Sequence, residues 1–230
     1  MAKKKPRTPA RPVQAPKRRD TRARKPPDRR LLAVAGAGAL VVIAAIVLWA
    51  AFSGSGGSAT NPPPQIAWAS LPGLQTGPPP WGANVLQLAG RLQPLGLNQL
   101  STEGTVEHIH QHVDLWVNGT KVALAPNTGI NDNSFITELH VHAGEPNVIH
   151  VESPKKANFY LGQFFGVWGV RLTQQCVGSF CGTLHWWVNG RPQSGNPADL
   201  KLADHQVIAI ALGKPPAQVP ASYDFARFGL

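Results

Sequence analysis

Alternating polar and apolar residues between positions 107 and 117 predict the central strand of this protein. Alternate residues of a strand point to the same face of its sheet, and Gln111 is the one polar residue that interrupts the apolar alternation. The apolar face would consist of Ile109, Val113, Leu115 and Val117. The opposite face would carry His108, His110, His112 and Asp114. The pattern therefore predicts three histidines in one row above a hydrophobic core.

A hairpin of residues 135–143 and 148–152 is predicted to carry a second group of histidines. If five residues form its loop, His140 lies opposite His150, and the apolar residues of both strands point to the core. A loop one residue shorter would place apolar residues among the histidines. Because burial of one face fixes strand register, we expect the five-residue loop. The polar face then carries His140, His142, His150 and Glu152, and the core face carries Val141, Ile149 and Val151.

The chain contains an internal repeat built around two Asn-Gly turns. Residues 113–119 (VDLWVNG) align with residues 184–190 (LHWWVNG), and Asn-Gly favours the two-residue hairpin turn. The return strands align as well, so we expect two similar antiparallel β units, about residues 105–153 and 176–213, packed face to face. The second unit lacks the clustered histidines. The fold of the unit therefore does not require them.

Apolar residues at helical spacing predict two short helices. The first covers residues 84–93, with Asn84 as its N-cap and Pro94 ending it. The second covers residues 161–168 and is expected to be buried, despite two glycines. The helices are therefore expected to accompany the β units and not to form a domain of their own.

The first 52 residues predict a membrane anchor. Residues 1–30 carry thirteen Lys or Arg against two acidic residues, so the net charge of +10 comes from this tail. Residues 31–52 are uncharged, and as a helix rising ~1.5 Å per residue they would span a hydrocarbon core of ~30 Å. The positive-inside rule places the tail in the cytoplasm, on anionic lipid of the bilayer, and the rest outside. A cleaved signal peptide or a twin-arginine signal is the alternative, and both also export the C-terminal part.

Residues 53–82 are rich in Gly, Ser and Pro and predict a linker, so the extracytoplasmic domain would cover residues 83–230. Cys176 and Cys181 are expected to form a disulfide in an exported protein. Their spacing is not typical of a redox pair or of a zinc site, which are the alternatives. The expected fold class is mainly β (α+β), with two related antiparallel β units and one or two short helices, preceded by a single transmembrane helix.

The histidines between residues 108 and 150 indicate a transition-metal site. Neutral imidazole suits Zn, Cu, Ni and Fe, and Met1 is the only methionine, which excludes a thioether-rich Cu(I) site. Zn(II) or Cu(II) is therefore expected first, with Ni(II) or Fe after them. A polar sheet face that hydrogen-bonds water and a pH sensor are the alternatives. The predicted ligands are His108, His110, His112, His140, His142 and His150, with Asp114, Glu145 and Glu152 to orient or complete them and His185 and His205 outside the cluster.

Seven motifs between residues 108 and 190 resemble those of a family of largely uncharacterised membrane-anchored or exported proteins, common in actinobacteria and also found in archaea. The resemblance covers about residues 84–225 and brings no established activity. The chain departs from it at Ala143, where the family has aspartate after the second His-x-His, so Glu145 is the expected replacement. The matching motifs are His108–Gly119, Pro126–Ile130, Leu139–His142, Val148–Ser153, Leu161–Gly169, Cys176–Cys181 and Val188–Gly190.

The sequence thus predicts a membrane-anchored, extracytoplasmic protein that binds Zn or Cu(II) through its histidine cluster, in envelope metal handling or in a structural role. A metal-dependent hydrolase or oxygenase is one alternative, and it would need an open coordination position and a base such as Glu145 or Glu152. An envelope interaction module without metal is another. No catalytic residue is assigned, no nucleic-acid partner is expected, and the sequence identifies no protein partner.

Overall fold

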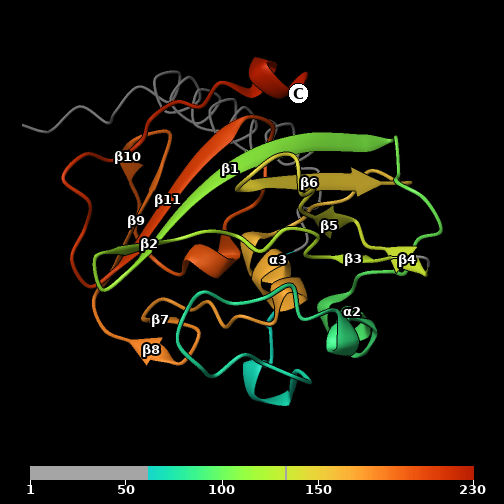
Figure 1. Cartoon of the computed structure of the whole chain (residues 1–230), viewed down its shortest axis with the longest axis horizontal. Coiled ribbons are helices and arrows are strands. Elements are labelled where there is room, and N and C mark those ends of the chain that lie inside the picture. Colours follow the sequence, from blue (N-terminus) through green and yellow to red (C-terminus); the bar gives the residue numbers. More distant parts are fainter. Residues whose placement is uncertain (1–61, 133) are drawn as a thin grey trace, which may run out of the picture. The chain divides into compact units, whose positions relative to one another are not determined.

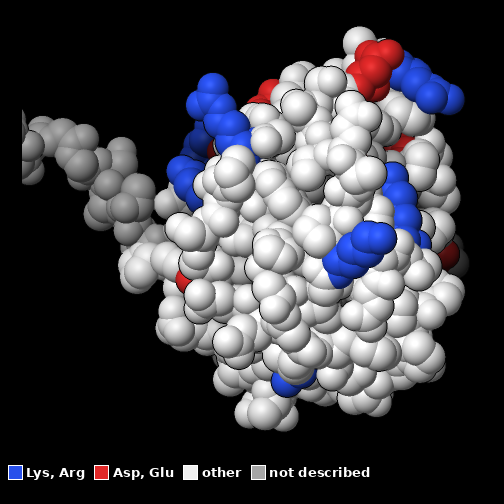
Figure 2. Space-filling view, turned by 90° about the vertical axis from the view of Figure 1, so that its left-hand side faces the viewer, with Lys and Arg blue, Asp and Glu red and all other residues white. Residues whose placement is uncertain are grey.

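The computed structural model describes residues 62–132 and 134–230 (Figure 1). The predicted basic tail, 1–30, the predicted transmembrane helix, 31–52, and the start of the predicted linker lie outside these residues. Within the described part of the chain, no helix is long and apolar enough to cross a membrane. This part carries nine Lys or Arg against ten Asp or Glu, and the face in Figure 2 is mostly uncharged, with isolated basic and acidic side chains.

A seven-stranded mixed β-sheet organises the domain around β1 (Glu107–Val117) (Figure 1). The strand order is β10-β9-β11-β1-β6-β5, and β2 also pairs with β1. β1 and β11 are parallel, whereas the other neighbours are antiparallel. The chain is therefore mainly β, as predicted. The remaining strands of this sheet are β2 (Thr120–Val122), β5 (Leu139–His140), β6 (Val148–Ser153), β9 (Leu184–Val188), β10 (Arg191–Pro192) and β11 (Gln206–Leu212).

Smaller elements surround the sheet. β3 (Ile130–Asn131) pairs with β4 (Phe135–Ile136), and β7 (Cys176–Val177) pairs with β8 (Phe180–Cys181). The disulfide between Cys176 and Cys181 is confirmed and closes the second of these pairs. Short 3₁₀ turns cover Trp68–Ser70, Val85–Gln87, Pro197–Asp199 and Phe225–Phe228.

Helix α3 (Leu161–Trp168) fills the core with the bounds that its apolar spacing predicted, and all eight of its residues are buried. Its two glycines have a packing reason. A Cβ on Gly166 would lie 2.5 Å from a Leu95 methyl carbon, and one on Gly162 would lie 2.8 Å from the Ala198 Cβ. Glycine therefore lets α3 approach its neighbours closely.

Helix α2 (Leu88–Leu95) begins later than predicted. Asn84 has left-handed backbone dihedrals and makes no side-chain cap; its amide donates instead to the Gly73 carbonyl. Pro94 lies inside the last turn, and the helix ends at Gly96, which has a positive φ of 69°. The inward face includes the buried Arg91, which donates to the carbonyls of Asn84 and Val167.

The predicted linker extends too far toward the domain. Leu71 and Trp81 are buried in the main core, and Ile66 and Trp68 pack against it. The segment has little regular structure because it is rich in proline and glycine, yet its apolar side chains still bury against the sheet and α3. The folded part therefore begins well before residue 83.

The two Asn-Gly turns are confirmed. Asn118 and Gly119 have φ values of 53° and 83°, and Asn189 and Gly190 have 51° and 74°. Two successive positive φ angles define the turn that matches the twist of antiparallel strands. Each turn is followed by a short antiparallel strand, β2 or β10.

The predicted face-to-face packing of the two β units is wrong. The units lie side by side in one sheet, joined by the parallel pairing of β1 with β11. They also differ internally: β6 and β2 pair with successive parts of one edge of β1, whereas β11 and β10 flank β9 on opposite edges. The repeat therefore preserves the hairpin turn but not the position of the return strand.

Candidate metal centre

The strand register brings three histidines into a row that crosses three strands. His110 on β1 lies opposite His150 on β6, and His140 on β5 lies opposite His150 from the other side. The ring centroids are 4.6 Å apart for the first pair and 5.3 Å for the second. The register expected from the five-residue loop is thereby confirmed at His140 and His150, although β5 ends at His140 and His142 follows it outside the strand.

Five histidines and one glutamate form two overlapping groups that could hold a metal ion. Within each group the ligand atoms lie within 4.8 Å of one another. The first donor set consists of His108, His110, His150 and Glu152. The second donor set consists of His140, His142, His150 and Glu152. Of the six predicted histidine ligands, five are therefore brought together, and Glu152 is itself a candidate ligand.

In the second donor set, His140 is buried and its ring is held by the backbone. Its Nδ1 lies 3.0 Å from the Thr137 carbonyl oxygen. A carbonyl only accepts, so Nδ1 carries the proton and Nε2 keeps its lone pair. That Nε2 lies 3.2 Å from the Nε2 of His142. Two nitrogens bound tetrahedrally to one ion at ~2.0–2.1 Å would be separated by roughly 3.3 Å, so the pair already has the spacing of ligands.

In the first donor set, the Nε2 of His108 lies 3.3 Å from Oε1 of Glu152. His110 is buried, and its Nε2 has no hydrogen-bond partner among the described residues. Buried polar atoms in native proteins are almost always paired, and an exception needs an explanation such as an ion. An ion bound to this nitrogen would supply the missing partner.

Glu152 and His150 lie where the two sets meet. The Nδ1 of His150 is 3.2 Å from Oε1 of Glu152, and its Nε2 contacts the Glu145 carboxylate. Burial alone would raise the pKa of Glu152, but the hydrogen bond to His150 holds it below its ordinary value. Glu152 is therefore a carboxylate near neutral pH.

The buried imidazoles of His140 and His110 are neutral near neutral pH. Burial lowers the pKa of His140 to about 3, against the smaller raising effect of Glu152. Burial, with the nearby His150 and His108, lowers the pKa of His110 to about 4. Neutral imidazole is the form that binds a metal ion, so at neutral pH these rings are already in the binding form.

His112 and Asp114, which were predicted to belong to the row, lie beyond it and occur in neither donor set found among the described residues. The residue opposite His112 on β6 is Val148, so no second histidine faces it. Its Nε2 lies 3.3 Å from Asp114, and its ring stacks on Tyr223 with centroids 3.9 Å apart.

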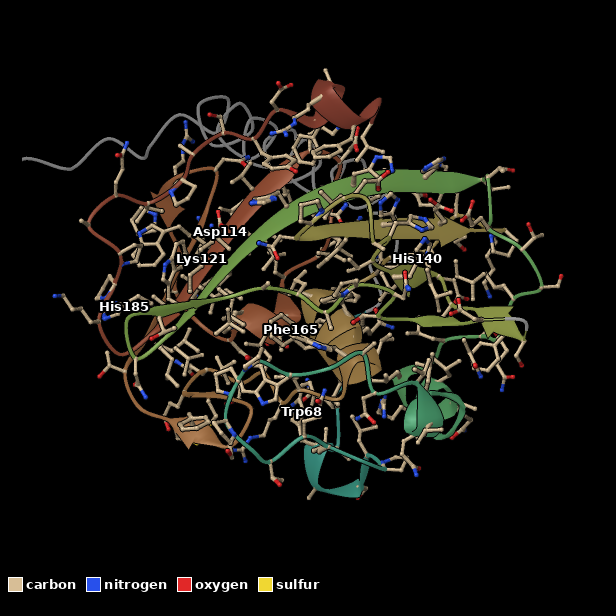
Figure 3. All side chains as sticks on the ribbon, in the orientation of Figure 1. Trp68, Asp114, Lys121, His140, Phe165 and His185 are labelled. Atoms are coloured by element: carbon tan, nitrogen blue, oxygen red, sulfur yellow. A yellow bond between two sulfur atoms is a disulfide. The ribbon has the colours of Figure 1, made fainter. Side chains whose placement is uncertain are left out.

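Asp114 contacts two residues that lie outside both donor sets, His112 and Lys121. Besides His112 it pairs with Lys121, 2.5 Å away, and Figure 3 shows the two side by side, apart from His140. Burial would raise the pKa of Asp114, but the hydrogen bonds from His112 and Lys121 lower it. Asp114 is therefore an ionised carboxylate that pairs with His112 of β1 and Lys121 of β2.

Several residues near the cluster were missed by sequence reasoning. Glu103 lies 3.4 Å from Nε2 of His142. Asp204 and His205 form a third, mostly exposed group with His110, although His205 was expected outside the cluster. The parallel pairing of Gln206 with Gln111 brings them there, and a pairing between such distant segments leaves no local signal in the sequence.

A hollow of about 640 Å³ lies away from the cluster, over the second β unit. Its lining includes Gln174, Gln193 and Trp186 and no member of either donor set. Comparison of the chain with protein-family models, with curated proteins and with solved structures gives no match.

Proposed function

We propose that this protein is anchored in the cell membrane by a single helix and binds a transition metal, Zn(II) or Cu(II), through the histidine cluster of its extracytoplasmic domain. Its role would be envelope metal handling or a structural metal site. The observation that carries the proposal is the convergence of five imidazoles and the Glu152 carboxylate, from three strands and the segment that follows β5, on a largely buried place.

The geometry supports a metal site better than a polar face that hydrogen-bonds water. Such a face would expose its rings, whereas His110, His140 and His150 are buried. Two of the nitrogens lie 3.2 Å apart, and the Nε2 of His110 has no partner in the described part of the chain. Bound positive ions would compensate both features.

The donor chemistry supports Zn(II) or Cu(II). Imidazole and carboxylate suit both ions, and the disulfide removes the two thiolates from the available ligands. The disulfide also fits an oxidising compartment outside the cytoplasm. The anchor itself is inferred from the apolar run 31–52, the basic tail before it and the family resemblance.

A metal-dependent hydrolase or oxygenase is the second candidate, because one edge of the cluster is accessible. The side chains of His108 and His142 are 50% and 32% exposed. Glu103 and Glu145 contact His142 and His150, where either could serve as a base for a metal-bound water. Turnover of model esters or of a dioxygen-dependent substrate only by the metal-loaded protein would favour this candidate.

The direct test is the metal content of the full chain, purified from membranes in detergent, stripped with chelator and reloaded with Zn(II) or Cu(II). We expect at least about one tightly held equivalent, and a large loss when His110 and His140 are both replaced by Gln. The matched control is His185→Gln, which removes an exposed histidine outside both donor sets. A protein that retains no metal, or retains it equally in the double variant, would contradict the proposal.

A further inference from the structure

We propose that the cluster is a two-metal centre, with one ion in each donor set and the Glu152 carboxylate shared between them. This inference rests on the proposed function and specifies how many ions the site holds and where each one lies.

The cluster is too large for a single ion to bind all of its histidines. Ligands that bind one ion at ~2.0–2.1 Å can be no more than ~4.2 Å apart. His108 and His110 do not occur in the same donor set as His140 and His142, even with the wider limit of 4.8 Å. A single ion would therefore leave two histidines of one set without metal, whereas two ions use both pairs.

Glu152 lies between the two donor sets. Its Oε1 lies 3.3 Å from Nε2 of His108 in the first donor set and 3.8 Å from Nε2 of His140 in the second. The same carboxylate thus reaches both histidine pairs. A carboxylate has two oxygens and can bind two ions at the ~3.5–4 Å separation of two-metal sites. Its negative charge would also offset the repulsion between them.

His150 also lies between the two donor sets. Its ring centroid lies 4.6 Å from that of His110 and 4.6 Å from that of His142, one from each donor set. Its two nitrogens face different carboxylates, Glu152 and Glu145. Each ion then has two histidines of its own, with His150 and Glu152 between the two.

The two positions should differ in affinity. In the second donor set, the Thr137 carbonyl orients the buried His140, and fixing the tautomer in this way raises metal affinity. In the first donor set, half of the His108 side chain is exposed, so ordering it costs more conformational entropy. We therefore expect the second donor set to fill first and the first donor set to fill at higher metal concentration.

The test is a Cu(II) titration of the chelator-stripped full chain in detergent, with bound copper measured after desalting and by electron paramagnetic resonance. We expect about two equivalents, and a spectrum that weakens or broadens as the second ion couples to the first through the shared carboxylate. His110→Gln and His142→Gln should each retain about one equivalent with an uncoupled spectrum. Glu152→Gln should weaken both sites by at least about tenfold, and His185→Gln should bind like the unaltered protein.

The outcomes separate this inference from the proposed function. One equivalent in the unaltered protein, lost in either single-histidine variant, would overturn the two-metal centre and leave the metal-binding proposal standing. Two equivalents that neither variant changes would place the ions elsewhere and overturn the inference. No bound copper or zinc would overturn both. Circular dichroism of each stripped variant shows whether a loss of metal reflects the site or a failure to fold.

Discussion

The two β units use the same hairpin turn with different strands behind it. β1 has eleven residues, whereas β9, which ends at the matching repeat position, has five. The extra residues of β1 carry His108, His110 and His112. In the second unit the corresponding segment, residues 178–183, contains β8, which pairs with β7 and is joined to it by the disulfide. The longer strand thus creates the row of histidines, and the common hairpin exists without it.

The equivalent tryptophans show what the units still share. Trp116 on β1 and Trp187 on β9 occupy matching repeat positions, and both pack around Ala209 and Ala211 of β11. They lie opposite Ala211 and Ala209, respectively. The small residues of β11 therefore leave room for one large ring from each side. The turn and this packing therefore belong to the scaffold, whereas the histidines are an addition to one of the two units.

The largest expected difference between the halves is the pH dependence of the metal-free protein. The pKa values of His140 and His110 are about 3 and about 4 in the folded chain, against ~6.5 in an unfolded chain. The unfolded chain therefore takes up protons first as the pH falls. Stability should be full above pH ~6.5 and should decrease below it by up to ~1.4 kcal/mol per pH unit for each histidine, until the folded pKa is reached.

Urea unfolding of stripped protein between pH 7 and pH 4 measures this effect. His140→Gln and His110→Gln should flatten the curve relative to the unaltered chain, because the variant side chain does not titrate. His185→Gln, in the second unit, should leave the curve unchanged. Parallel curves for all four proteins would show that the histidine row does not control acid stability.

The next effect is stabilisation by bound metal. An ion that binds only the folded state at 100 times its dissociation constant adds ~2.7 kcal/mol. We expect Zn(II) to raise the thermal midpoint of the unaltered protein, and to raise that of the His110→Gln, His142→Gln double variant far less. An equal increase in both proteins would locate the stabilising ion outside the two donor sets.

The shared turns should respond unequally to the same change. Both Gly119 and Gly190 have positive φ, so replacement by alanine strains either turn by ~1 kcal/mol. A Cβ at position 190 would also lie 2.7 Å from the Ala221 Cβ, whereas one at position 119 meets nothing within 4 Å. Gly190→Ala should therefore lower the free energy of unfolding more than Gly119→Ala in urea titrations. Equal losses would mean that the segment around Ala221 simply moves away.

The smallest effect concerns His112, which lies on the histidine face of β1 but outside both donor sets. His112→Phe keeps a ring to stack on Tyr223 and should leave the number of bound metal ions unchanged. His110→Gln, two residues away on the same face, should remove about one. Loss of an ion in His112→Phe would return His112 to the metal centre.

Much of the local structure could be predicted because it depends on neighbouring residues. Strand alternation predicted which face of β1 carries histidine, and burial of the opposite face selected the register that pairs His140 with His150. Apolar spacing predicted α3 with its bounds. Asn-Gly predicted both turns. The membrane anchor, which also depends on a local apolar run, stays a prediction because residues 31–52 lie outside the described part.

Sequence alone predicts the turns, the polar face of β1 and the pairing of His140 with His150, since alternation and turn chemistry act within a few residues. The tertiary structure adds that β11 pairs in parallel with β1, that His112 faces Tyr223 and Asp114, and that His110, His140 and His150 are buried. Those outcomes depend on contacts between segments far apart in the chain. Parallel pairing in particular needs a long connection between the two strands, and no local sequence pattern predicts the path of that connection.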